Sequence, residues 1–135
     1  MVVDAGPLYA YVDRDDRHHR ECLTLLTEHP GPLIVPVLVV TEVAYFLETR
    51  LGAGVAVRFL GDIASRASIL EHVADQDWLR IAGLVWQYRD MELGTVDASV
   101  IAVAERLDVR QLATLDRRHF AAVQPKHAPA FDLLP

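Results

Sequence analysis

The chain opens with MVVDAGPLYA (residues 1–10), and the order of residue types in this segment indicates how the rest is built. The two valines form a short β-branched run that is typical of a buried strand. The run ends in a carboxylate, Asp4, and Pro7 then stands where we expect the first position of a helix. A strand that carries an acid at its C-terminal end and continues into a helix is the arrangement with which open α/β sheets build binding sites.

Strand-like and helix-like segments alternate through the remaining residues. Short apolar runs predict strands at residues 33–35, 68–73, 111–115 and 131–134, the last of them at a sheet edge. Amphipathic spacing predicts helices over residues 15–29, 36–51, 54–66, 75–89 and 96–107. This alternation predicts a single α/β domain over residues 1–135 with a mostly parallel central sheet.

Four acidic residues stand where this topology would bring distant segments together. Asp4 and Asp116 each follow an apolar strand, and parallel strands end at the same edge of a sheet. Asp97 lies in the first turn of a helix that we expect Thr95 to cap, and Glu42 interrupts an almost wholly apolar helical segment. The topology, rather than the local context, distinguishes these four from other acids with apolar neighbours, namely Asp62, Glu71 and Asp132.

Each of the four acids also has a simpler interpretation when it is taken alone. Glu42 could lie at a protein–water boundary, and Asp97 could merely favour the positive end of a helix dipole. Asp4 or Asp116 could cap a helix or form a turn. In the same way, Trp78 and Trp86 are most simply core or interface aromatics.

Composition restricts the class of protein. The net charge of −6 is unusual for a nucleic-acid binder, but two Mg²⁺ ions held by clustered acids would bring it to −2. Cys22 is the only cysteine, so it cannot form an internal disulfide; it fits a reducing cytosol and a position in the core. No apolar run approaches the roughly 18 residues of a membrane span, and no signal-peptide pattern opens the chain, so we expect a cytoplasmic protein without membrane contact.

Four segments, in their order and spacing, carry a resemblance to a known family. They are Val2-Val3-Asp4 with Leu8-Tyr9-Ala10, Pro36 with Thr41-Glu42, Gly94 to Ala98, and Thr114 to Phe120. Together they resemble PIN-domain ribonucleases, specifically the VapC-type toxins of bacterial toxin–antitoxin pairs, over essentially the whole chain. The resemblance implies a three-layer α/β/α fold and places the family's acidic positions on Asp4, Glu42, Asp97 and Asp116.

The function implied is metal-dependent cleavage of RNA. Converging carboxylates stay ionised together only around a cation, and oxygen ligands favour Mg²⁺ or Mn²⁺. Asp4, Asp97 and Asp116 would hold the metal directly or through water, and Glu42 would bind metal or orient the attacking water. Arg117 and Arg118 are either contacts for RNA phosphates or solvated surface.

The resemblance also implies partners and one departure from the family. VapC-like toxins are inhibited by a VapB-like antitoxin whose arm crosses the acidic groove, commonly form homodimers, and cleave structured RNAs such as tRNA or ribosomal RNA loops to leave a 5′-phosphate. The family often has hydroxyl or amide side chains directly after the first acid, where this chain has Ala5-Gly6, so we expect less side-chain support for a metal there.

Two other classes of function stay open. A catalytically silent PIN-like module would bind RNA or a protein without cutting. A phosphoacceptor signalling domain is also α/β with clustered acids, but its chemistry needs a nearby lysine, and the single lysine, Lys126, lies beyond the last of the four segments. A P-loop enzyme is disfavoured because no glycine-rich loop ends in Lys-Ser or Lys-Thr.

Overall fold

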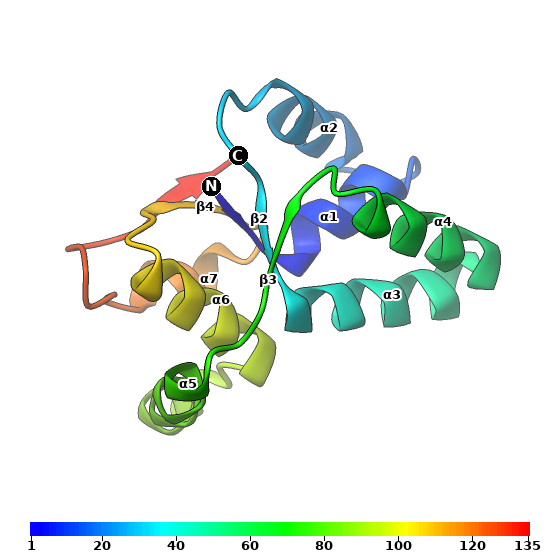
Figure 1. Ribbon diagram of the computed structural model, residues 1–135. Coiled ribbons are helices and arrows are strands. Elements are labelled where there is room, and N and C mark those ends of the chain that lie inside the picture. Colours follow the sequence, from blue (N-terminus) through cyan, green and yellow to red (C-terminus); the bar gives the residue numbers. More distant parts are fainter.

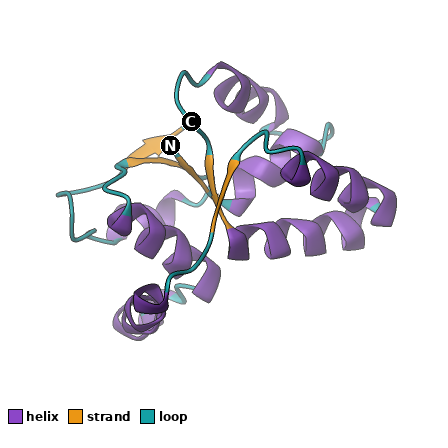
Figure 2. Ribbon diagram, in the orientation of Figure 1, coloured by secondary structure: helices purple, strands orange, loops and turns teal.

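A five-stranded sheet, parallel throughout, lies at the centre of the computed structural model, which describes all residues from 1 to 135 (Figures 1 and 2). The strand order is β3-β2-β1-β4-β5, so the first strand of the chain occupies the middle of the sheet. The strands are β1 (Val2–Val3), β2 (Ile34–Pro36), β3 (Ile69–Glu71), β4 (Gln111–Ala113) and β5 (Asp132–Leu134). The α/β prediction is confirmed, and residues 131–134 do provide an edge strand.

Helices cover the sheet on both sides, which makes the three-layer α/β/α arrangement. In Figure 1, helices α1 to α4 lie to the right of the crossing strands and α5 to α7 lie to the left. The seven α-helices are α1 (Ala5–Val12), α2 (His19–Glu28), α3 (Val37–Leu51), α4 (Ala53–Ala64), α5 (Asp75–Gln87), α6 (Thr95–Arg106) and α7 (Arg117–Ala122), and a 3₁₀ turn, η1 (Arg89–Met91), links α5 to α6. None of the helices combines the length and the apolarity that crossing a membrane requires.

Three helices begin earlier than predicted and two begin later. Helix α4 starts at Ala53 instead of residue 54, while α2 starts at His19 instead of residue 15 and α3 at Val37 instead of residue 36. Helix α1 starts at Ala5, directly after Asp4, so Pro7 occupies its third position instead of its first. Helix α6 starts at Thr95, and Gly94 is the residue that precedes it. The N-cap residue is Gly94 instead of Thr95, and the Asp97 carboxylate turns back to it, because Asp97 Oδ2 accepts a hydrogen bond from the Gly94 amide at 3.3 Å.

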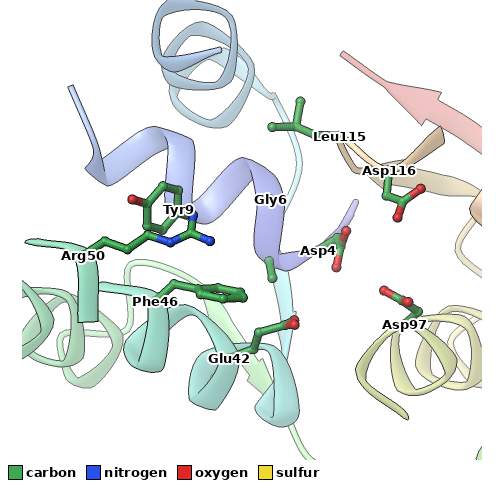
Figure 3. A pocket seen from close by; sticks show the side chains of 10 residues that line it. Asp4, Gly6, Tyr9, Glu42, Phe46, Arg50, Asp97, Leu115 and Asp116 are labelled. Atoms are coloured by element: carbon green, nitrogen blue, oxygen red, sulfur yellow. The ribbon is translucent and has the colours of Figure 1, made fainter. Parts of the chain in front are cut away.

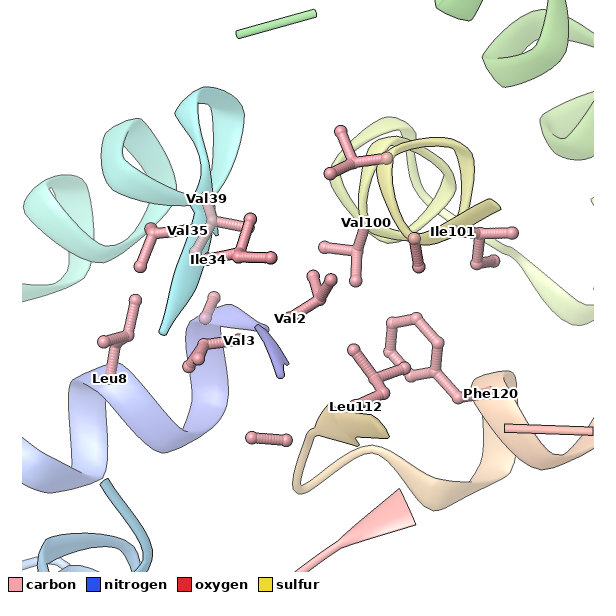
Figure 4. Close-up of a cluster of buried hydrophobic side chains, with 14 of the residues drawn as sticks. Val2, Val3, Leu8, Ile34, Val35, Val39, Val100, Ile101, Leu112 and Phe120 are labelled. Atoms are coloured by element: carbon pink, nitrogen blue, oxygen red, sulfur yellow. The ribbon is translucent and has the colours of Figure 1, made fainter. Parts of the chain in front are cut away.

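The core is built from the apolar residues of the inner strands and of the helix faces that cover them. Val2, Val3, Val35 and Leu112 are each 0% exposed, and Figure 4 shows them packed with side chains from α3, α6 and α7. Full burial of such a side chain contributes about 1.5–3 kcal/mol to the free energy of unfolding, so these residues stabilise the positions of β1, β2 and β4 in the sheet. The prediction that Cys22 is a core residue is confirmed by its 0% exposure.

Trp78 and Trp86 are not core residues. The exposed fractions of Trp78 and Trp86 are 49% and 70%, so the core alternative for these two aromatics was wrong. Both lie on α5, whose buried face is supplied by Ile81 and Leu84 instead. Helical spacing assigns residues to faces, but it does not tell which face a large amphipathic ring will take.

The position of β1 decides where the polar side chains gather. Val3 pairs with Ala113 of β4, and the Asp4 amide donates to the Ala113 carbonyl at 2.9 Å. The C-terminal ends of β1 and β4 are therefore adjacent, and the residues that follow them lie at the same edge of the sheet.

Candidate active site

Asp4 is the buried member of the acidic cluster. It follows the central strand, is 5% exposed, and accepts a hydrogen bond through Oδ2 from the Thr114 hydroxyl at 2.8 Å. Burial raises the pKa of Asp4 to about 7, the Thr114 hydrogen bond opposes the shift, and the carboxylates of Asp97 and Glu42 add to it. An acid in this environment needs either a proton or a cation nearby at neutral pH.

Thr114 connects the first and last acids of the cluster. Its Oγ1 donates to Asp4 and accepts from the Asp116 amide at 3.0 Å. The predicted strand over 111–115 ends at Ala113, and this early end lets Thr114 turn its side chain to both partners. Asp116 is then fixed as the cap of α7, because its Oδ1 accepts from the His119 amide at 3.2 Å.

His119 lies between two of the carboxylates. Its Nδ1 is 3.3 Å from Asp97 Oδ2 and 3.1 Å from Asp116 Oδ2, while Nε2 is 2.9 Å from the carbonyl oxygen of Met91. Since a carbonyl only accepts, Nε2 donates to Met91, and the buried Nδ1 lies within ion-pair distance of both acids without a hydrogen bond of its own. The sequence analysis gave His119 no role; its place three residues after Asp116 was the signal that could have identified it.

Asp97 and Glu42 complete the cluster from two separate helices. Burial raises the pKa of Asp97, while the Gly94 amide and His119 oppose the shift. Burial and the nearby Asp97 carboxylate both raise the pKa of Glu42 on α3. Figure 3 shows Asp4, Glu42, Asp97 and Asp116 directed toward the same space.

These four acids line one pocket with a volume of about 430 Å³. They come from α3, α6 and the ends of β1 and β4, and they are up to 112 positions apart in the chain. The other end of the pocket is lined by Tyr9, which belongs to one of the four family-like segments, and by Phe46 and Arg50, which were not predicted as site residues. Glu42, Phe46 and Arg50 recur every four residues on α3, and this spacing was the signal for a shared face.

Ala5 and Gly6 also line the pocket, and their lack of polar side chains is offset in part by β4. The hydroxyl group that supports Asp4 comes from Thr114 instead of from the residue after the acid. Gly6 permits this arrangement, because a Cβ at that position would lie 3.2 Å from Leu115 Cβ. The small side chain therefore lets the segment after β4 approach α1 closely.

The two arginines proposed from the sequence lie outside this pocket. Arg117 and Arg118 are exposed on the first turn of α7, and neither is among the residues that line the acidic space. The Arg117 guanidinium donates to the carbonyl of Pro135, so it is directed toward the C-terminal end of the chain.

The chemistry of the site suits a hard divalent cation. The four acids offer carboxylate oxygens, and burial together with neighbouring carboxylates raises the pKa values of Asp4, Glu42 and Asp97. As they stand, no three His, Cys, Asp or Glu side chains form a group that could hold an ion by themselves. An ion in this space would take several ligands from water, as Mg²⁺ usually does.

Comparisons with known proteins agree on one family. Residues 1–125 match the family model of the PIN domain. Ribonuclease VapC26 of Mycobacterium tuberculosis is 30% identical over 135 residues, which is the full length of both chains. The crystal structure of Mycobacterium tuberculosis VapC20, described as a toxin that cleaves the sarcin–ricin loop, has a TM-score of 0.83, with 21% identity over 90% of this chain and 93% of that one, and shares its fold.

Proposed function

This chain belongs to the PIN-domain family, and from that premise we propose that it is an endoribonuclease toxin of the VapC type that hydrolyses RNA phosphodiester bonds. The observation that carries the proposal is the meeting of four acids from separate elements in one pocket, in a chain that aligns along its whole length with a ribonuclease. A catalytically silent relative would have no need to keep four charges so close together.

The catalytic cofactor we propose is Mg²⁺ or Mn²⁺. Asp4, Asp97 and Asp116 would hold it, directly or through water. When bound, it would polarise the scissile phosphate and make the attacking water more acidic. The carboxylate oxygens of the four acids favour these two ions, which prefer oxygen ligands.

The remaining side chains prepare the site for this chemistry. Thr114 keeps the Asp4 carboxylate in place, and His119 orients Asp97 and Asp116. Glu42, with a raised pKa, is suited to accept a proton from the attacking water or to orient it. Hydrolysis by water would leave a 5′-phosphate on one product and a 3′-hydroxyl on the other.

The partners we propose follow from membership of the VapC group. An RNA of the tRNA or ribosomal RNA class would be the substrate, with the exposed Arg117 and Arg118 as additional phosphate contacts. A VapB-like antitoxin would inhibit the enzyme by covering the acidic pocket, and two copies of the chain would form a homodimer. We expect the protein to act in the cytoplasm, where such RNAs are found.

A cleavage assay tests the proposed function. Purified protein is incubated with total RNA and Mg²⁺, Mn²⁺ or EDTA, and Asp4→Asn and Asp97→Asn are compared with Arg20→Ala, a change of an exposed residue outside the pocket. We expect metal-dependent cleavage that the two acid variants lose and Arg20→Ala keeps. Binding of RNA without cleavage would favour the silent module, and 2′,3′-cyclic phosphate ends would show that the 2′-hydroxyl is the nucleophile.

A further inference from the structure

At the end of the acidic pocket away from the four acids, the lining side chains are aromatic and positively charged. Tyr9 of α1 and Phe46 of α3 supply aromatic rings there, and Arg50 supplies a guanidinium (Figure 3). The Arg50 guanidinium carbon is 4.6 Å from the centre of the Phe46 ring and 5.3 Å from that of Tyr9. These are distances at which a cation is attracted to an aromatic face.

The aromatic end is held in place by contacts of its own. The rings of Tyr9 and Phe46 meet edge to face with centroids 6.4 Å apart. The Tyr9 hydroxyl donates to Asp13 at 2.9 Å, which fixes the ring against α1. The two aromatic side chains therefore present a preformed platform instead of two freely moving groups.

Arg50 itself has no acidic partner. It takes part in none of the ion pairs of the structure, although it lines a pocket that contains four acids. Stacking on Phe46 holds the guanidinium by its face. The Tyr9 hydroxyl lies beside the guanidinium, and the remaining N–H groups can donate to an anion. A planar cation presented in this way is suited to a phosphate, with which it can form two parallel hydrogen bonds.

The position of the Arg50 guanidinium on α3 sets its distance from the acids. The guanidinium lies over Phe46, which is four residues from Glu42 on the same helix, and this corresponds to about 6 Å of axial rise. A phosphate bound beside Arg50 would therefore be a neighbour of the phosphate at the acids. Anionic phosphates and flat bases alternate along an RNA strand. This end of the pocket offers a cation for a phosphate and aromatic rings for a base.

We propose that Arg50, with Phe46 and Tyr9, forms a flanking subsite that binds an unpaired stretch of RNA beside the scissile bond. This inference rests on the proposed ribonuclease function and extends it to the kind of RNA that is bound. Arg50 would bind a phosphate, and the neighbouring base would stack on the aromatic platform. Because only an unpaired base can leave its neighbours to stack on a side chain, the subsite selects loops or single strands over duplexes.

A binding experiment with uncleaved RNA tests the subsite. The Asp4→Asn variant serves as the background, because it is expected to prevent cleavage while Thr114 can still hydrogen-bond at that position. A short fluorescein-labelled RNA without secondary structure is titrated at several salt concentrations, followed by its duplex. Arg50→Ala, Arg50→Lys and Phe46→Leu are compared with Arg20→Ala as the matched control, since Arg20 is an exposed arginine outside the pocket.

We expect Arg50→Ala to weaken single-strand binding about tenfold, the loss typical of a charge-assisted hydrogen bond. It should also reduce the slope of log affinity against log salt by about 0.7, the value for one lost phosphate contact on a single strand. Arg50→Lys should keep the slope and lose part of the affinity, because it retains the charge without the planar stack. Phe46→Leu should weaken binding without changing the slope.

Three results would overturn the subsite. The first is that Arg50→Ala has the same affinity and the same salt slope as Arg20→Ala. The second is that duplex binding depends on Arg50 as strongly as single-strand binding does. The third is that the Asp4→Asn background variant shows no measurable RNA binding. The proposed function fails separately, through absence of metal-dependent cleavage by the unmodified protein. A protein that cleaves RNA but ignores Arg50 would thus refute only the subsite.

Discussion

Replacing Asp4 by Asn should make the metal-free protein more stable at alkaline pH while removing its activity. Asp4 is 5% exposed, and burial raises its pKa from the ordinary value of 3.8 to about 7. The folded chain therefore keeps a proton on Asp4 over a pH range in which the unfolded chain has already released it. Because the folded state binds more protons in that range, unfolding free energy falls as pH rises from about 4 to about 7 and then levels off.

The size of the effect follows from the two pKa values. The gap between 3.8 and about 7 corresponds to about 4 kcal/mol of lost unfolding free energy once the pH is well above 7. At pH 5 less than half of this loss is already present, so roughly 2–3 kcal/mol is added between pH 5 and pH 8. The Asn side chain has nearly the same shape and no charge, so the variant lacks this component of the pH dependence.

Urea unfolding of both proteins in EDTA, at pH 5 and at pH 8, measures the difference. Any constant cost of the amide group cancels, because only the change of the stability difference between the two pH values is compared. We expect the stability of Asp4→Asn relative to the unmodified protein to rise by roughly 2–3 kcal/mol from pH 5 to pH 8. Equal pH dependence in the two proteins would refute the view that Asp4 is held as an uncompensated buried acid.

Four further outcomes are expected. Mg²⁺ should stabilise the unmodified protein at pH 8 by about 2.7 kcal/mol at a hundred times its Kd and should do so much less for Asp4→Asn; equal shifts would place the ion elsewhere. Thr114→Val removes the hydrogen bond that opposes the raised pKa of Asp4, so the acid limb of the pH–rate profile should move to higher pH, and an unmoved limb would contradict this role. His119→Gln should lower kcat or metal affinity 10- to 100-fold with unfolding free energy little changed, as followed by cleavage rates and metal titration. Arg106→Ala removes the 3.0 Å ion pair of the Asp77 carboxylate, and Asp77 is only 3% exposed. The free energy of unfolding, measured with denaturant, should therefore fall by about 3–5 kcal/mol, and the molecules that remain folded should keep their activity.

Local patterns were sufficient for the alternation of strands and helices. A β-branched run before one acid predicted β1, and an apolar run before a second acid predicted β4. Gly52 directly follows α3 with a φ of +92°, a conformation that favours glycine at the end of a helix. These features depend on neighbours in the chain, which is why sequence reasoning could reach them.

Helix starts and aromatic positions were less predictable, because they depend on competition between partners. The rules favour Thr95 as the cap of α6, yet Gly94 holds the cap position, and Asp97, three residues after Gly94, accepts from its amide. Trp78 and Trp86 have the residue type of a core, but α5 buries Ile81 and Leu84 in their stead. In both cases the outcome depends on packing that no short window of sequence contains.

From its sequence alone, this protein was determined to be a parallel α/β domain with four acids in reach of one sheet edge, because periodicity, turn residues and strand-terminal acids are local properties. Only the tertiary structure decided which side chains support those acids and what lies opposite them. The Thr114 hydroxyl reaches Asp4 across 110 positions, His119 lies between Asp97 and Asp116, and Arg50 stacks on Phe46 and Tyr9 without an acidic partner. Hydrogen bonds, charge and stacking act over a few ångströms in space, so these relations exist only once the strands and helices are packed together.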